Sequence, residues 1–408
     1  MALTGDKRVT TRDAGGRRRR VADYLGLERN VVVVSAVVLL MGFGEELWKR
    51  YLPKYLEALG AGAGVVGLFG TTKDFFDAVY QYPGGWLADR VGRRRAFLTF
   101  IALASAGYFV YLVSPSWPFV FLGLALSMSW GSCASPAVFA VIGDALPKER
   151  RAMGFTLQSM LKRVPMAVAP LAGGALIARA GVVSGVRVGL VVMLALAGAG
   201  AALALAINLP VAVGEPANVR GVWRSFHVAL KRLLVSDIII RTCEGTAEIF
   251  VVLYVTDVTG ISLPRYGALV AVQMVTAILV YVPAAKIADR VGRKPFVIAT
   301  FVCFALFPVA VILAKSFTTL IVAFVIGGLR EIGEPSRKAM IVDFAEPHLR
   351  ARTVGLYYLV RSLTITPAAA LGGLLWKVEP RATFIAAGVV GIVGTIVFAA
   401  TVEERYAS

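Results

Sequence analysis

Long apolar runs follow one another along almost the whole chain, and each is about as long as a helix that crosses a bilayer. In the first half they fall at residues 30–58, 63–89, 94–114, 117–143, 152–179 and 184–208. In the second half they fall at residues 236–259, 264–288, 294–314, 316–343, 351–377 and 380–402. The runs lack the alternation of a transmembrane β-strand. The pattern predicts an all-α polytopic membrane protein with twelve transmembrane helices.

Polar segments divide this pattern into five regions. Residues 1–28 form a polar tail that no signal-peptide core or cleavage site follows, so we expect it to be retained. A first six-helix bundle is predicted over 29–208, a linker over 209–235, a second bundle over 236–402 and a short tail over 403–408. Within the linker, residues 222–234 are amphipathic, with Arg224, Lys231 and Arg232 on one face. We expect this stretch to lie along the membrane surface.

The composition supports a bilayer as the solvent of this chain. Hydrophobic residues make up 58% of it and charged residues 17%, and the net charge is +18. The basic residues gather in alternate short loops, which explains the charge by orientation in the membrane and not by a nucleic-acid partner. We expect a monomeric, multi-pass protein of a prokaryotic plasma membrane, with both termini cytoplasmic.

The two halves of the chain repeat each other. LADRVGRRRAF at 87–97 recurs as IADRVGRKPF at 287–296, and Gly173-Gly174 recurs as Gly372-Gly373. Lys162 matches Arg361 at an offset of 199, and Glu46 matches Glu248 at an offset of 202. A duplicated six-helix unit is the architecture of transporters whose substrate sits between two pseudo-symmetric halves.

The loop GGWLADRVGRRRAF at 84–97 resembles the signature of the major facilitator superfamily between helices 2 and 3, and the loop at 285–296 resembles its partner in the second half. The resemblance implies two pseudo-symmetric six-helix bundles and a conformational latch at the cytoplasmic side. The residues carried over to this latch are Gly85, Asp89, Arg90, Gly92, Arg93, Asp289, Arg290, Gly292 and Arg293. A purely topogenic role of the arginines is the alternative. Pro170 to Gly174 also resembles the end of a motif associated with antiporters of this family.

Charged residues inside the predicted spans are the candidates for the transport site, because a charge near the bilayer centre costs at least about 2.5–3.5 kcal/mol. We expect the repeat-related Glu46 and Glu248, with Asp77 and Glu244, to carry protons. The candidate substrate ligands are Lys162, Arg330, Glu334, Arg337 and Arg361, which would favour a solute with an anionic group. The alternative is that most of these charges form structural pairs.

The sequence contains no ATP-binding loop, metal-ligand spacing or catalytic nucleophile motif, so we expect neither an enzyme nor a cofactor. The first hypothesis is therefore a secondary transporter that exports a small polar or amphiphilic solute by alternating access, driven by a proton gradient. The second is an importer or uniporter of an organic anion. The third is a membrane sensor or assembly factor that kept the fold without transport.

Overall fold

The computed structural model describes residues 29–135, 137–138, 141, 148–207, 219–224, 226–345 and 350–403. Every regular element among these residues is helical. Eight helical segments are long and apolar enough to cross a membrane, and Trp117–Cys133 is a shorter apolar segment. The predicted spans at 63–89, 236–259 and 316–343 are helical as well, but charges or breaks interrupt them. The all-α polytopic fold with twelve spans is therefore confirmed.

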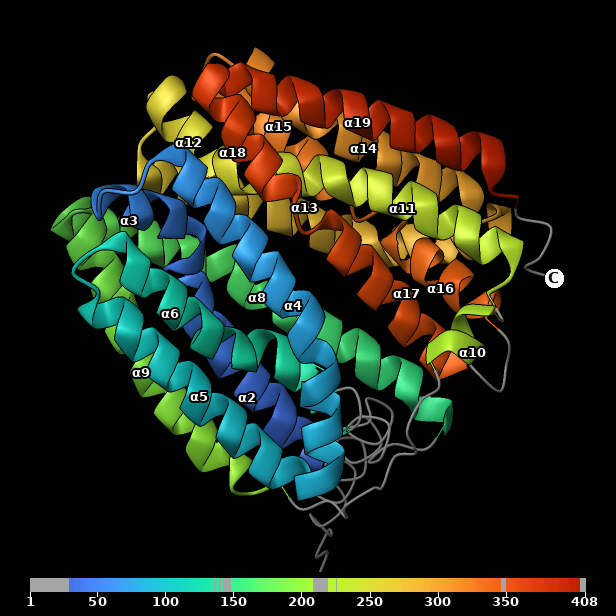
Figure 1. Ribbon diagram of the computed structural model, residues 1–408, viewed down its shortest axis with the longest axis horizontal. Coiled ribbons are helices and arrows are strands. Elements are labelled where there is room, and N and C mark those ends of the chain that lie inside the picture. Colours follow the sequence, from blue (N-terminus) through green and yellow to red (C-terminus); the bar gives the residue numbers. More distant parts are fainter. Residues whose placement is uncertain are drawn as a thin grey trace, which may run out of the picture.

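The two halves of the chain form two helical bundles that lie side by side, blue to green and yellow to red in Figure 1. The first contains α2 (Arg29–Glu46), η1 (Lys49–Tyr51), α3 (Leu52–Ala58), α4 (Ala63–Val91), α5 (Arg93–Val113), α6 (Trp117–Met128), η2 (Ser129–Cys133), α8 (Lys148–Ala180) and α9 (Val182–Ala204). The second contains α11 (Val228–Ala247), η3 (Glu248–Phe250), α12 (Val251–Leu253), η4 (Tyr254–Val258), α13 (Leu263–Val291), α14 (Lys294–Leu313), α15 (Phe317–Leu329), α16 (Glu334–Asp343), α17 (Arg350–Ile365), α18 (Ala368–Val378) and α19 (Pro380–Thr401).

The spans are interrupted at repeat-related positions. The first span of each half changes to a 3₁₀ turn, at Lys49–Tyr51 and at Glu248–Phe250. The fourth span of each half is also irregular, with a π turn at Ser129–Cys133 and turns at residues 330–333. Irregular turns of this kind are frequent where a helix lines a functional cavity.

Glycine contacts show that the repeat extends to the packing of the helices. A Cβ atom at Gly173 would lie 1.9 Å from the Leu47 carbonyl oxygen, and one at Gly372 would lie 2.2 Å from the Thr246 carbonyl oxygen. Leu47 and Thr246 are 199 positions apart, as are the 3₁₀ turns that begin at Lys49 and Glu248. The backbone of the first span therefore repeats at an offset of 199.

This register corrects the matching of Glu46 with Glu248 at an offset of 202. At the structural offset of 199, Glu45 is the equivalent of Glu244, and Glu248 is the equivalent of Lys49. The two carboxylates share a residue type but lie about one helical turn apart in their respective halves, because a 3-residue shift is close to one turn.

The linker also differs from its prediction. The stretch 222–234 is not one surface helix, because it is divided between α10 (Val219–Arg224) and α11, which begins at Val228. His227 caps α11, since its Nδ1 atom accepts a hydrogen bond of 3.2 Å from the Ala229 amide. Leu230, Leu233 and Leu234 are buried in the second bundle, so this apolar face packs on protein.

The halves meet closely at the end of the bundle that carries α3 and α12. The Tyr51 and Tyr266 rings form an edge-to-face pair with centroids 6.0 Å apart. A Cβ atom at Gly267 would lie 2.5 Å from the Tyr51 hydroxyl, and the Ala370 amide donates a 2.9 Å hydrogen bond to Thr71. Since α4 and α13 run from this end to Gly92 and Gly292, the close contacts lie opposite the duplicated loops.

The repeat-related glycines yield a stability prediction. Gly173→Ala and Gly372→Ala place a methyl group against a backbone carbonyl that cannot move away, so each should destabilise the protein by about 1–3 kcal/mol. Thermal unfolding of the purified protein in detergent measures this effect.

The matched control is Gly198→Ala in α9, where a Cβ atom meets nothing within 4 Å. This control should unfold at the same temperature as the native protein or above it, because alanine favours the helix. If both glycines tolerate alanine as well as Gly198 does, the packing of the repeat described above is wrong.

Candidate functional site

A cavity of about 550 Å³ lies between the two halves. Most of its wall comes from the interrupted first spans, from α4, α6 and α8 of the first half and from α11 of the second, and α5, α13, α17 and α18 add single residues or pairs. The charged residues in this wall are Glu45, Glu46, Lys49, Arg50, Lys73, Asp74, Asp77, Lys162, Arg241, Glu244 and Glu248. Volumes of this size are typical of sites for small molecules.

One arginine connects the two halves across this cavity. Arg50 Nε lies 3.2 Å from Glu46 Oε2, and Arg50 Nη1 lies 3.4 Å from Glu248 Oε1. The other Glu248 oxygen lies 3.5 Å from Arg330 Nη1. Glu46 is buried whereas the Glu248 side chain is 38% exposed. The two predicted proton carriers therefore face the same guanidinium group, although they are not equivalent in the repeat.

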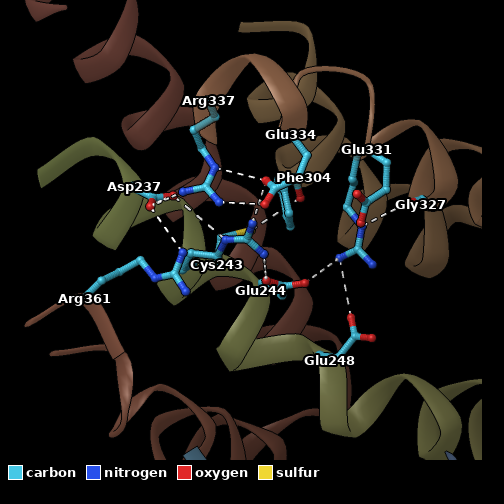
Figure 2. Close-up of polar contacts among 12 residues, drawn as sticks. Asp237, Cys243, Glu244, Glu248, Phe304, Gly327, Glu331, Glu334, Arg337 and Arg361 are labelled. Carbon is cyan, nitrogen blue, oxygen red and sulfur yellow. Dashed lines mark hydrogen bonds and ion pairs between the residues drawn. The ribbon is translucent and has the colours of Figure 1, made fainter. Parts of the chain in front are cut away.

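A dense network of charges fills the interior of the second half, where Figure 2 shows side chains from α11, α16 and α17 pointing toward one another. Asp237 is fully buried, and its Oδ2 atom accepts hydrogen bonds from Arg337 (2.5 Å), Tyr357 (3.0 Å) and Arg361 (3.4 Å). Arg337 binds both oxygens of Glu334, at 3.0 and 2.7 Å. These carboxylates neutralise the charge of Arg337, which is only 1% exposed.

Arg241 and Glu244 extend this network to the cavity. Arg241 donates hydrogen bonds to Glu244 (2.7 Å) and to Glu334 (3.1 Å). Arg330 lies 3.5 Å from Glu244 and packs its guanidinium over the ring of Phe307, 4.7 Å from the centroid. A continuous chain of alternating charges thus runs from Glu248 into the core of the second half.

The first half has a different wall. Glu45 accepts a 2.6 Å hydrogen bond from Tyr108, and Lys49 lies 3.5 Å from the same carboxylate. The other carboxylates of this wall are also bonded, since Lys73 lies 3.0 Å from Asp74, and Ser132 donates a 2.7 Å hydrogen bond to Asp77.

Lys162 on α8 differs from these residues. Its side chain is exposed to the cavity, and it has no hydrogen bond or ion pair with the side chains that the structure describes. Its ammonium group is repelled by Lys49 and attracted by Glu45, Glu46 and Asp77 across the cavity.

Another connection between the halves lies beside Lys162. Arg163 donates a 2.8 Å hydrogen bond to Glu331, and its guanidinium packs over the ring of Tyr281 at 4.7 Å. Both partners belong to the second half. Rocking of the bundles would have to break this pair.

The duplicated loops turn at glycines with positive φ angles, 87° at Gly92 and 108° at Gly292. Residues with a Cβ atom rarely adopt such angles, which explains the glycine in both copies. Arg293 in the second loop forms an ion pair with Asp343 at the end of α16. The second loop is therefore joined by charge to the span that carries Glu334 and Arg337.

Other residues of the predicted latch are placed as follows. Arg90 packs over the ring of Trp86, 5.1 Å from the centroid, and is exposed, as is Arg290. Arg93 is buried. Gly85, Asp89 and Asp289 lie outside the described side chains. The latch stays a prediction.

The structure brings the four predicted proton carriers to one place, because Glu46, Asp77, Glu244 and Glu248 all line the cavity. Of the predicted substrate ligands, only Lys162 lines it. Arg330, Glu334 and Arg337 are buried in the network behind the wall, where each is bonded to a partner, and Arg361 joins them through Asp237. These roles stay predictions, but the geometry favours Lys162 for contact with a solute.

Two important residues escaped the sequence analysis. Asp237 lies near the predicted end of its span and is not among the predicted site residues. Its spacing from Arg241, Glu244 and Glu248 places all four on one face of a helix, which is the signal that could have identified it. Arg50 is likewise absent from the predicted site residues, and only the fold shows that it reaches Glu248.

Comparisons with known proteins agree with this architecture. The profile of the Major Facilitator Superfamily matches residues 34–247 and 233–408. An uncharacterized MFS-type transporter of Methanocaldococcus jannaschii is 22% identical over 396 residues, which cover 90% of this chain and 93% of the relative. The multidrug resistance protein MdtG of Citrobacter koseri is 26% identical over 286 residues, 67% of this chain and 70% of that protein.

Solved structures show the same fold. A POT family transporter in complex with 5-aminolevulinic acid superimposes with a TM-score of 0.76 at 14% identity, over 91% of this chain and 95% of the other. The nucleoside transporter NupG superimposes with a TM-score of 0.76 at 12% identity, over 91% and 100% of the two chains. With its duplicated six-span bundles, its charged cavity between them and a profile match across both halves, the chain belongs to the Major Facilitator Superfamily of membrane transporters.

Proposed function

We propose that this protein is a proton-coupled secondary transporter that exports a small polar or amphiphilic solute by alternating access. The proposal rests above all on the cavity between the halves, whose wall holds Glu46 and Glu248 on either side of Arg50. A proton on either carboxylate removes its attraction for Arg50. Because Arg50 belongs to the first half and Glu248 to the second, a proton on Glu248 would weaken the contact between the halves. A proton on Glu46, which lies on the same span as Arg50, would change how Arg50 is held within the first half.

Other features of the chain support this proposal. The basic residues of alternate loops favour cytoplasmic termini in a prokaryotic plasma membrane, and the protein would act as a monomer in the lipid bilayer without a cofactor. The similarity to MdtG, a multidrug resistance protein, favours export over import. The relative from Methanocaldococcus jannaschii is an MFS-type transporter, which favours transport over a sensor or assembly role.

One observation favours a second candidate, the import or uniport of an organic anion. Lys162 presents a charge to the cavity that the described side chains do not bond. A solute with an anionic group would supply the missing partner. Both candidates use the same cavity, so they differ in the direction and coupling of transport.

The coupling role of the carboxylates is tested in liposomes that contain the purified protein and a pH-sensitive dye. A library of metabolites and drugs is added to the native protein, and at least one compound should change the internal pH. Glu46→Gln or Glu248→Gln should abolish this change, because a glutamine cannot release a proton, whereas solute exchange without a gradient should persist.

Glu379→Gln is the matched control, since this exposed glutamate lies outside the cavity wall and should leave proton movement unchanged. If both glutamine variants in the cavity still move protons with the compound, the carriers lie elsewhere, and Asp77 and Glu244 are tested next. If no compound moves protons in the native protein while solute exchange occurs, proton coupling is wrong.

The latch yields a separate prediction. Asp89→Asn should insert into the membrane normally but transport more slowly, with fewer molecules in the state that is open to the outside. The reason is that the neutral amide attracts the neighbouring arginines less than a carboxylate does. Cysteine accessibility at the cytoplasmic side and the transport rate measure the two effects. Native values of both in this variant would contradict the latch.

A further inference from the structure

The internal repeat allows each half to be compared with the other, position by position. At the offset of 199 that the packing establishes, Lys162 is the equivalent of Arg361, and Val38 is the equivalent of Asp237. In the second half Arg361 and Asp237 lie 3.4 Å apart. In the first half the cation is kept, but an apolar side chain occupies the position of its partner.

Other charged residues of the second-half network also have uncharged equivalents in the first half. Glu334 and Arg337 of the second half correspond to Ser135 and Val138 of the first, and Arg241 corresponds to Gly42. Each replacement is smaller and uncharged. Val38, Gly42, Ser135, Val138 and Lys162 all line the cavity, whereas of their equivalents only Arg241 does, and Asp237, Glu334, Arg337 and Arg361 lie outside its wall. The volume that large charged side chains fill in one half is thus open in the other.

The carboxylates that share the cavity wall with Lys162 and attract its charge are already bonded to other groups. Glu45 accepts a hydrogen bond from Tyr108 and lies beside Lys49, while Glu46 pairs with Arg50 and Asp77 accepts a hydrogen bond from Ser132. Because these carboxylates already have partners and Lys49 is a like charge, the Lys162 ammonium can still gain a new anionic partner.

We propose that the part of the cavity lined by Val38, Gly42, Ser135, Val138 and Lys162 is the substrate site. It binds an organic anion, whose carboxylate, sulfonate or phosphate group pairs with Lys162 as Asp237 pairs with Arg361 in the second half. The remainder of the solute would lie against Val38 and Val138, with Gly42 and Ser135 leaving the room for it. This inference rests on the proposed function and adds the class of solute to it. It moves solute recognition from Arg337 in the second half to Lys162 in the first.

The proposal is tested by binding in detergent, which needs neither a membrane nor a proton gradient. The probes are benzoate and benzenesulfonate, with uncharged benzamide as the control. Both anions should raise the unfolding temperature of the native protein, and benzamide should not. Lys162→Gln should weaken binding of the anions by about tenfold to hundredfold, the effect of losing one charge-assisted contact. Lys162→Arg should retain binding, and so should Lys315→Gln, because Lys315 is exposed and outside the cavity wall.

Val38→Asp tests the comparison of the halves directly. It restores the carboxylate that the second half has, so the aspartate should pair with Lys162 and abolish anion binding. The same substitution should be destabilising when Lys162 is replaced by glutamine, because the carboxylate is then unpaired. A non-additive effect of the two changes on unfolding therefore shows the pair even where one variant is poorly stable.

The results separate this inference from the proposed function. Anion binding that is unaffected by Lys162→Gln, or the absence of any shift with both anions, overturns the inference. In the liposome assay, the Lys162→Gln variant is given the same concentration of compound as the native protein. If it still moves protons, the inference about Lys162 is overturned, whereas the proposed transport function is supported. Anion binding through Lys162 in a protein that moves no solute supports the site and contradicts the transport function.

Discussion

A charge buried between membrane helices must be neutralised within the protein, and this constraint explains much of the structure. Arg337 is buried among three helices and is held by two carboxylates, Asp237 and Glu334. Removing one member of such a set leaves an uncompensated charge, which typically costs about 3–5 kcal/mol. The same requirement connects the halves, because Arg50 joins Glu46 to Glu248. The positions of α11, α16 and α17 are fixed by these pairs as well as by apolar packing.

The duplicated fold meets this constraint differently in its two halves. The backbone is repeated closely, down to the glycines that let α8 and α18 approach the first span of each half. Most of the network's charges are not repeated: the second half is cross-linked by its arginines, whereas the first half has the small uncharged residues Val38, Gly42, Ser135 and Val138 at the positions of Asp237, Arg241, Glu334 and Arg337. A rigid half facing a more open one suits a transporter, since the open half can hold a solute while the other half moves as a unit.

Much of this architecture could be predicted from the sequence, and the failures have physical causes. Apolar runs of membrane length predict the spans, and the repeated ADRVGR loops predict the two bundles. The matching of Glu46 with Glu248 failed because identical residue types do not define backbone register, which the 3₁₀ turns at Lys49 and Glu248 establish.

The partners of the charges could not be predicted, since residues as distant in sequence as Asp237 and Arg337 meet only in the fold. The predicted substrate ligand Arg337 and its neighbours looked available because their counter-charges were unknown. Lys162 could be recognised as different only once the other cations were seen to be paired.

The central claim, that buried charges of the second half hold each other, is tested most directly by a double-mutant cycle between Asp237 and Arg337. Asp237→Asn and Arg337→Gln should each lower the free energy of unfolding by about 3–5 kcal/mol, because each removes a partner from a buried charge. The double variant should be much less destabilised than the sum of the two, since both charges are gone. Losses that simply add would show that the two residues act independently, and would contradict this account.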